Sequence, residues 1–134
     1  MKKVQCHILF VEDNLDTQEI VSMFLQIEGY RVTSVHTAAE ALRLVRTQAF
    51  DLYLLDNRLP DESGIALCQQ LRESDPHTPI IFYSAKAYET DKQQALAAGA
   101  QGYLTKPCNL TELEQMISAF LDGQCQANSL AGSV

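Results

Sequence analysis

Residues 50–60 of the chain read FDLYLLDNRLP. The apolar run Leu52–Leu55 has the length and composition of a buried strand, and it ends on the carboxylate of Asp56. An acid at this place is common where a helix follows, because its side chain can cap the helix N-terminus. One acid therefore says little about function, and its meaning depends on how the other strands end.

Short apolar runs alternate with helical patterns along the chain. Five runs predict strands, at residues 8–11, 31–35, 52–55, 80–83 and 102–105. Apolar residues at helical spacing, with caps and stop glycines, predict helices within residues 20–27, 37–45, 65–71, 91–98 and 109–121. This alternation favours an α/β fold in which helices cover both faces of a parallel sheet.

Reactive side chains stand at the ends of four of these strands. Glu12 and Asp13 follow the first strand, Asp56 the third, Ser84 the fourth and Lys106 the fifth. Right-handed crossovers place the carboxyl ends of all strands on one edge of the sheet, and ligands of such sheets bind at that edge. Helix capping accounts for one or two of these residues, but a lysine caps no helix N-terminus. We therefore expect a functional site.

The types of residue in this group limit its chemistry. Three carboxylates held together repel one another, and Mg2+ relieves that repulsion because it prefers clustered oxygen ligands. A carboxylate beside a metal can attack a phosphoryl donor and form an aspartyl phosphate. Asp56 is central in the sheet and is the expected acceptor, with Glu12 and Asp13 as metal ligands. Ser84 and Lys106 would then bond and neutralise the phosphoryl oxygens.

Four short motifs occur in order along the chain: VEDN at 11–14, LLDNRLPDESG at 54–64, YSA at 83–85 and YLTKP at 103–107. With these motifs the sequence resembles the receiver domains of two-component response regulators, in particular the single-domain chemotaxis receiver. The resemblance runs from about Ile8 to Leu121. It implies a flavodoxin-like, doubly wound (βα)5 fold whose five parallel strands have the order 2-1-3-4-5.

The resemblance also implies a function in signal transduction. Asp56 would accept a phosphoryl group from a phosphohistidine of a sensor histidine kinase or phosphotransfer protein. Mg2+ would be held by Glu12, Asp13, Asp56 and the backbone carbonyl of Arg58, with one carboxylate acting through water. Such a protein catalyses only its own phosphorylation and dephosphorylation, so we expect a phosphoprotein and not an enzyme acting on other substrates.

Further roles follow from the same resemblance. The peptide bond between Lys106 and Pro107 is expected to be cis and to aim the lysine at the site. Tyr103 matches an aromatic switch residue that turns inward as the hydroxyl of Ser84 moves toward the phosphoryl group. The surface of the fourth helix, fifth strand and last helix would then change and bind a downstream protein. Tyr103 can also be read simply as a half-buried aromatic at a strand end.

Some positions depart from the family's commonest pattern. Glu12 stands where aspartate is frequent and Ser84 where threonine is frequent, but both keep the needed oxygen. Cys108 stands where an aromatic often follows the lysine–proline pair, which affects only the packing of that loop. Arg58 and Lys86 lie at positions that tune phosphoryl lifetime in the family. Either they shield the acyl phosphate from water or they are solvated surface residues.

Length, charge and cysteines narrow the class of protein. The 134 residues suit one domain, which we place at 1–123, followed by a flexible polar tail at 124–134. A formal net charge of -7 disfavours direct binding of nucleic acid. No signal peptide or membrane-spanning run is present in the sequence, so we expect a cytoplasmic protein without membrane insertion. The four cysteines form no CxxC pair, which favours reduced thiols.

Three other classes of protein share part of this residue pattern. The main alternative is that the same receiver is a fragment of a longer response regulator or hybrid histidine kinase. A haloacid-dehalogenase-like phosphatase needs an acid two residues after the nucleophile, where this chain has Arg58. A degenerate receiver that only binds partners conflicts with the complete set of acids, hydroxyl and lysine. Oligomeric state is left open, although the last helix lacks the lysines and arginines of dimerising DNA-binding regulators.

Overall fold

Five parallel strands form one sheet in the order β2-β1-β3-β4-β5, as predicted. The computed structural model describes residues 5–86 and 88–121. The strands are β1 (His7–Val11), β2 (Arg31–Val35), β3 (Leu52–Leu55), β4 (Ile80–Ser84) and β5 (Gly102–Thr105). The helices are α1 (Leu15–Ile27), α2 (Ala38–Val45), α3 (Gly64–Ser74), α4 (Glu89–Ala97) and α5 (Leu110–Leu121).

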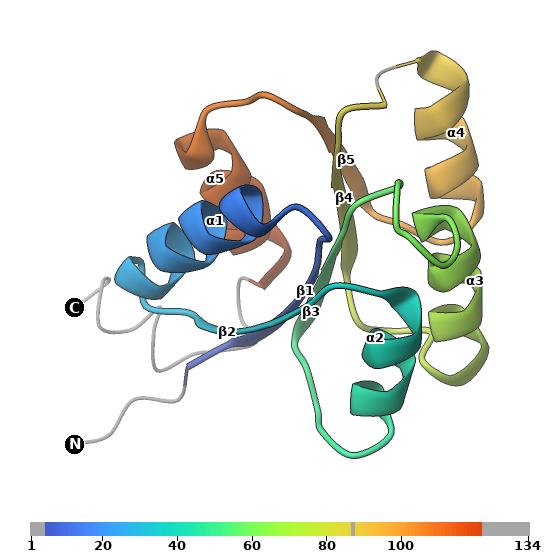
Figure 1. The fold of residues 1–134 in the computed structure, drawn as a ribbon, viewed down its shortest axis with the longest axis horizontal. Coiled ribbons are helices and arrows are strands. Elements are labelled where there is room, and N and C mark those ends of the chain that lie inside the picture. The colour runs from blue at the N-terminus through green and yellow to red at the C-terminus, as the bar shows by residue number, and fades with distance from the viewer. Residues whose placement is uncertain (1–4, 87, 122–134) are drawn as a thin grey trace.

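The sheet divides the core into two apolar layers. Figure 1 shows α1 and α5 on one face of the sheet and α2, α3 and α4 on the other. Successive strand residues serve opposite layers, so Ile8 and Phe10 pack with α1 and α5, whereas Leu9 and Val11 pack with α2 and α3. Because both faces are covered, the central strands carry apolar residues on both sides, as the continuous runs in the sequence indicated.

Local signals set the helix ends that border the site. The side chain of Asn14 accepts a hydrogen bond from the Thr17 amide and caps α1, which ends before Gly29 at φ 103°. Thr37 caps α2 through the Glu40 amide. The carboxylate of Glu40 in turn accepts from the amide of His36 at 2.9 Å and from the hydroxyl of Thr37 at 3.3 Å.

The structure corrects several predicted details. Helix α1 begins at Leu15, five residues before the apolar pattern that predicted it. Ile20 and Ile27 belonged to that pattern, but they are 57% and 78% exposed, while Val21 and Leu25 form the buried stripe. Apolar residues on more than one face of a helix cannot all reach the core. Helix α4 also begins two residues early, at Glu89.

One cysteine departs from the sequence prediction. Cys6 is disulfide-bonded, so the prediction of reduced thiols is wrong for this residue, while Cys68 and Cys108 are free thiols. Sequence spacing alone does not say which cysteines a fold brings together. The predicted tail at 124–134 lies outside the described residues. Among the residues described, no helix is long and apolar enough to cross a membrane.

Candidate functional site

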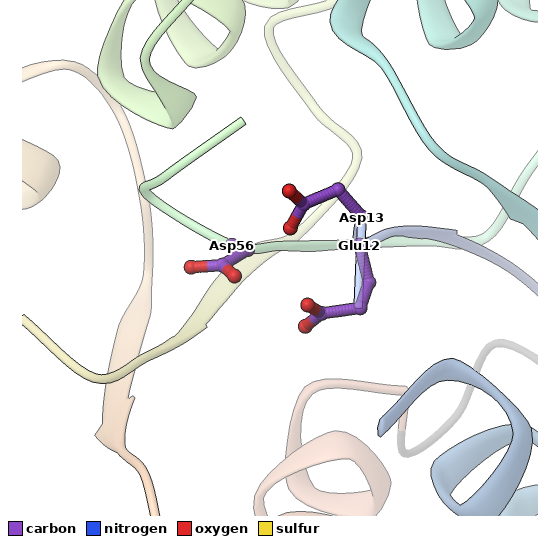
Figure 2. A group of neighbouring side chains, drawn as sticks. All are labelled: Glu12, Asp13 and Asp56. Carbon is purple, nitrogen blue, oxygen red and sulfur yellow. The ribbon is translucent and has the colours of Figure 1, made fainter. Parts of the chain in front are cut away.

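Three carboxylates meet where β1 and β3 end. Glu12 and Asp13 directly follow β1, and Asp56 directly follows β3, its neighbour in the sheet. One oxygen of each carboxylate lies within 4.8 Å of the other two, and Figure 2 shows the three side chains around a common space. Glu12 is fully buried and Asp56 nearly so, whereas Asp13 is exposed. The site is therefore an acidic group with one side open to solvent.

Lys106, which follows β5, points its ammonium into this acidic group. Its Nζ donates to Oε1 of Glu12 at 2.7 Å and to Oδ2 of Asp56 at 3.2 Å. The same Nζ lies 5.4 Å from the centre of the Tyr83 ring, which supplies a cation–π contact. One ammonium faces three carboxylates, so the group keeps a net negative charge and attracts a cation.

Burial and charge shift the pKa values of this pair. Loss of solvent raises the pKa of Glu12, and the hydrogen bond from Lys106 offsets only part of that rise. Burial opposes the charged form of Lys106, but the hydrogen bond to Glu12 and the charge of Asp56 outweigh it and raise its pKa. Lys106 is thus held in its cationic form.

The loop after β3 holds Asp56 rigidly. The amide of Asp56 donates to the carbonyl of Val11 at 3.1 Å, and Oδ1 of Asp56 accepts from the amide of Arg58 at 3.1 Å. The amide of Gly64, the first residue of α3, donates to the carbonyl of Asn57 at 2.8 Å. A Cβ at position 64 would overlap the carbonyl oxygen of Asp56. Glycine is therefore required where the loop folds back over the acceptor.

The β1–α1 turn is equally ordered. Oε2 of Glu12 accepts from the amide of Asn14 at 3.1 Å, so both oxygens of this carboxylate have hydrogen-bond donors. The side-chain amide of Gln18 donates to the carbonyls of Glu12 and Val35, at 3.0 and 3.1 Å. These contacts join α1 to the ends of β1 and β2.

The hard oxygen donors of the three carboxylates, with solvent access at Asp13, suit Mg2+.

Ser84 and Tyr103 are connected through the backbone of one residue, Lys86. Oγ of Ser84, which is buried, accepts from the amide of Lys86 at 3.2 Å. The hydroxyl of Tyr103 donates to the carbonyl of Lys86 at 2.7 Å, and its ring stacks on Phe82 with centroids 5.6 Å apart. The loop after β4 is thus linked both to the site and to β5. The peptide bond between Lys106 and Pro107 is cis.

Arg58 and Lys86, which lie in the loops after β3 and β4, are both exposed. With Ala85, Tyr88 and Asp91 they line a hollow of about 590 Å3 between the loops after β3 and β4. Both cations border this hollow, and their exposure is compatible with either of the roles considered for them.

Sequence reasoning missed three residues that shape the site. The ring of Tyr83 lies against the ammonium of Lys106. Its place next to Ser84 at the end of a predicted strand is the signal that could have found it. Both carboxylate oxygens of Asp61 accept amides at the start of α2, at 3.0 Å each. This contact and the bridge made by Gln18 join segments far apart in the sequence, and no local pattern marks them.

Residues 8–118 match the response regulator receiver domain family, and the chain belongs to that family. This membership removes the phosphatase alternative. The regulatory protein VanR of Enterococcus faecium is 40% identical over 115 residues, which are 85% of this chain and 49% of that protein. The chain spans about half the length of the curated relatives it matches.

Solved structures agree with this assignment. A CheY-like receiver domain protein from Methanospirillum hungatei JF-1 is 31% identical with a TM-score of 0.86, over 90% of this chain and 97% of that one. The receiver domain of the sensor histidine kinase PA1611 from Pseudomonas aeruginosa PAO1 is 33% identical with a TM-score of 0.81, over 88% and 98%. That structure has a magnesium ion coordinated in its active-site cleft.

Proposed function

We propose that this receiver domain accepts a phosphoryl group on Asp56 from a phosphohistidine of a sensor kinase or phosphotransfer protein. The observation that carries the proposal is the carboxylate of Asp56 held between two further acids and the ammonium of Lys106, 3.2 Å away. In the reaction a carboxylate oxygen bonds to phosphorus while the bond from phosphorus to the donor's ring nitrogen breaks. The bonding electrons stay on that nitrogen, and the donor leaves as histidine.

The reaction needs a cation beside the acceptor, and Mg2+ fits the donors. Glu12, Asp13, Asp56 and the backbone carbonyl of Arg58 would hold it, with one of the two acids after β1 acting through water. When bound, Mg2+ would supply positive charge that reduces repulsion between the carboxylates and the phosphoryl oxygens. The magnesium in the PA1611 receiver domain supports this assignment.

The chain's own groups act on the phosphoryl oxygens. Lys106 neutralises their charge, Ser84 turns its hydroxyl toward one of them, and the amide of Arg58 donates beside Asp56. The exposed side chains of Arg58 and Lys86 tune the lifetime of the acyl phosphate by limiting access of water. The domain promotes only its own phosphorylation and dephosphorylation.

The signal leaves through the surface made by α4, β5 and α5. Movement of Ser84 toward the phosphoryl group breaks its contact with the amide of Lys86, which shifts the loop after β4. That shift changes the contact between Lys86 and Tyr103 and so alters the position of the tyrosine ring. A change of a few kcal/mol between the two arrangements is enough to alter their populations. A downstream protein then distinguishes the two surfaces.

A second candidate is the same receiver acting as part of a longer response regulator or hybrid histidine kinase. The observation that favours it is coverage, since the matched relatives are about twice as long as the aligned region. The length of the native gene product distinguishes the two candidates.

Phosphorylation by a small donor tests the proposal. Incubation with acetyl phosphate and Mg2+ should add one phosphoryl group in intact-mass analysis, and Asp56→Asn should abolish the addition because an amide is not a competent nucleophile. Asp16→Asn, which changes an exposed acid in the first turn of α1, is the matched control and should label normally. Persistent labelling of Asp56→Asn would place the acceptor elsewhere.

A further inference from the structure

Helix α4 is the most loosely packed of the helices. Ala95 is the only residue of this helix that is buried, and Leu96 is 52% exposed. Tyr88, which precedes the helix, is 79% exposed. Figure 1 shows α4 at the margin of the molecule, beside α3. With so little buried apolar surface, the position of α4 depends on how its two ends are attached.

The C-terminal end of α4 is attached through one arginine of α3. Nε and Nη2 of Arg72 both donate to the carbonyl of Gly99, at 3.0 and 2.9 Å, and Nη2 also donates to Oε1 of Gln101 at 3.0 Å. Nη1 donates to the carbonyl of Asp75 within the same region, at 2.9 Å. Gln101 is in turn joined to Ile80 of β4, whose amide donates to its side chain at 2.7 Å. We call Arg72, Gly99 and Gln101 the Arg72 clamp.

Packing reinforces the clamp. A Cβ at Gly99 would lie 2.8 Å from Cγ of Arg72, so the arginine side chain lies directly against this turn. The thiol of Cys68 in α3 contacts the carbonyl of Ala98 at 3.5 Å, and Ala100 is buried. A cation at the carbonyls that follow a helix also opposes the negative end of its dipole. This end of α4 is thereby fixed to α3 and β4.

The N-terminal end of α4 is attached in a different way. It follows Lys86, whose amide donates to Ser84 and whose carbonyl accepts from Tyr103. Tyr88 and Glu89 are exposed. Within the described part of the chain, the hydrogen bonds that join this end to the sheet therefore run through Ser84 and Tyr103, the two residues that the proposed function sets in motion.

We propose that the Arg72 clamp is the pivot of α4, so that phosphorylation swings the N-terminal end of the helix while its C-terminal end stays in place. This inference rests on the proposed function, because the displacement starts at Ser84. The surface near Tyr88 changes most between the two states, and the surface near Leu96 changes least. Arg72 is a positioning residue, since it lies at the far end of α4 from the phosphorylation site and acts only through the helix.

Amide hydrogen exchange resolved by NMR tests the pivot. The full chain is compared with and without beryllium trifluoride and Mg2+, which imitate the phosphoryl group on Asp56. Near the N-terminal end, the reporters are the amides of Lys86, Asp91 and Lys92. At the clamp, the reporters are the amides of Gly99, Ala100 and Gln101, which donate to Leu96, Ala95 and Ile80.

In the wild-type protein, activation should change exchange at the N-terminal reporters by about tenfold or more and leave the clamp reporters within about twofold. In Arg72→Met, activation should change exchange at both sets, because the C-terminal end is no longer held. Arg72→Lys keeps the charge but loses the planar fork, and it should restore part of the clamp protection. Arg43→Met, an exposed arginine of α2, is the matched control and should behave as wild type.

The outcomes separate the pivot from the proposed function on which it rests. Equal changes at both reporter sets in wild type, or unchanged clamp reporters in activated Arg72→Met, would overturn the pivot while leaving phosphorylation of Asp56 intact. Absence of any response around Asp56 would overturn the proposed function and the pivot together. If Arg72→Met does not fold, the test rests on Arg72→Lys. Activation must then increase amide exchange at the clamp reporters more in Arg72→Lys than in the wild-type protein.

Discussion

Replacement of Gly64 with alanine should destabilise the protein and disturb the acceptor at the same time. The added Cβ would overlap the carbonyl oxygen of Asp56 and lie 2.8 Å from Cα of Asn57 and 2.9 Å from Cε2 of Phe82. Two of these atoms are backbone atoms of the site loop, and the third belongs to a fully buried ring. None of them can move without displacing the acceptor or the core.

The size of the effect follows from two opposing contributions. Alanine is favoured over glycine inside a helix by up to about 1 kcal/mol, and less at the first helical position. Forcing an extra carbon into a packed site costs about 1–3 kcal/mol or more, and rigid neighbours place this case at the upper end. We expect a net loss of about 2 kcal/mol in the free energy of unfolding, which corresponds to roughly 6–10 °C in Tm for a domain of this size.

Urea unfolding and acetyl phosphate labelling together test this expectation. Gly29→Ala is the control, because no atom lies within 4 Å of its Cβ and only its φ of 103° opposes the substitution. Backbone strain alone should lower the free energy of unfolding of Gly29→Ala by about 1 kcal/mol and leave labelling of Asp56 unchanged. A Gly64→Ala protein destabilised no more than Gly29→Ala, with normal labelling of Asp56, would refute the close-packing argument.

Three further predictions follow from the site and the sheet. Lys106→Met should lower the free energy of unfolding by about 3–5 kcal/mol in urea titrations, because Glu12 is left buried without its cation; a loss below about 1 kcal/mol would contradict this. Millimolar Mg2+ should raise Tm in wild type but much less in Asp13→Asn, since metal binding to the native state stabilises it; equal rises would contradict a site at Asp13. Burial, and then the charge of Arg31, lower the pKa of His7 from 6.5. The unfolded state therefore binds more protons than the folded state. The contribution of neutral His7 to the free energy of unfolding is complete above about pH 6.5 and is lost as pH falls through the lowered pKa. His7→Gln should lose less stability than wild type between about pH 7.5 and pH 5.5, and parallel pH profiles would contradict the assignment.

Most of the fold follows from periodicity in the sequence. The bounds of β2, β3 and β5 equal their predicted runs, because polar or turn residues border each run. The first five residues of α1 fall outside the predicted helix, since Leu15 is exposed and its polar neighbours give no apolar stripe. The strand order came from the resemblance, as strand lengths and spacings do not determine which strands are neighbours.

The sequence predicts which residues come together in the site, but not the contacts that they make there. Parallel topology places Glu12, Asp56 and Lys106 on one edge whatever the side chains do. It does not determine that Lys106 pairs with Glu12 at 2.7 Å, because that distance depends on rotamers and on packing against Tyr83. The bond from Arg72 to Gly99 joins residues 27 positions apart, and nothing local in the sequence marks it.

Chemical mapping of the acyl phosphate tests the central proposal most directly. After incubation with acetyl phosphate and Mg2+, borohydride reduction converts an aspartyl phosphate to homoserine, which peptide mass spectrometry locates. The proposed function predicts homoserine at position 56 alone, and none when the phosphodonor is omitted. Homoserine at position 13, or modification of any other residue in place of Asp56, would contradict it.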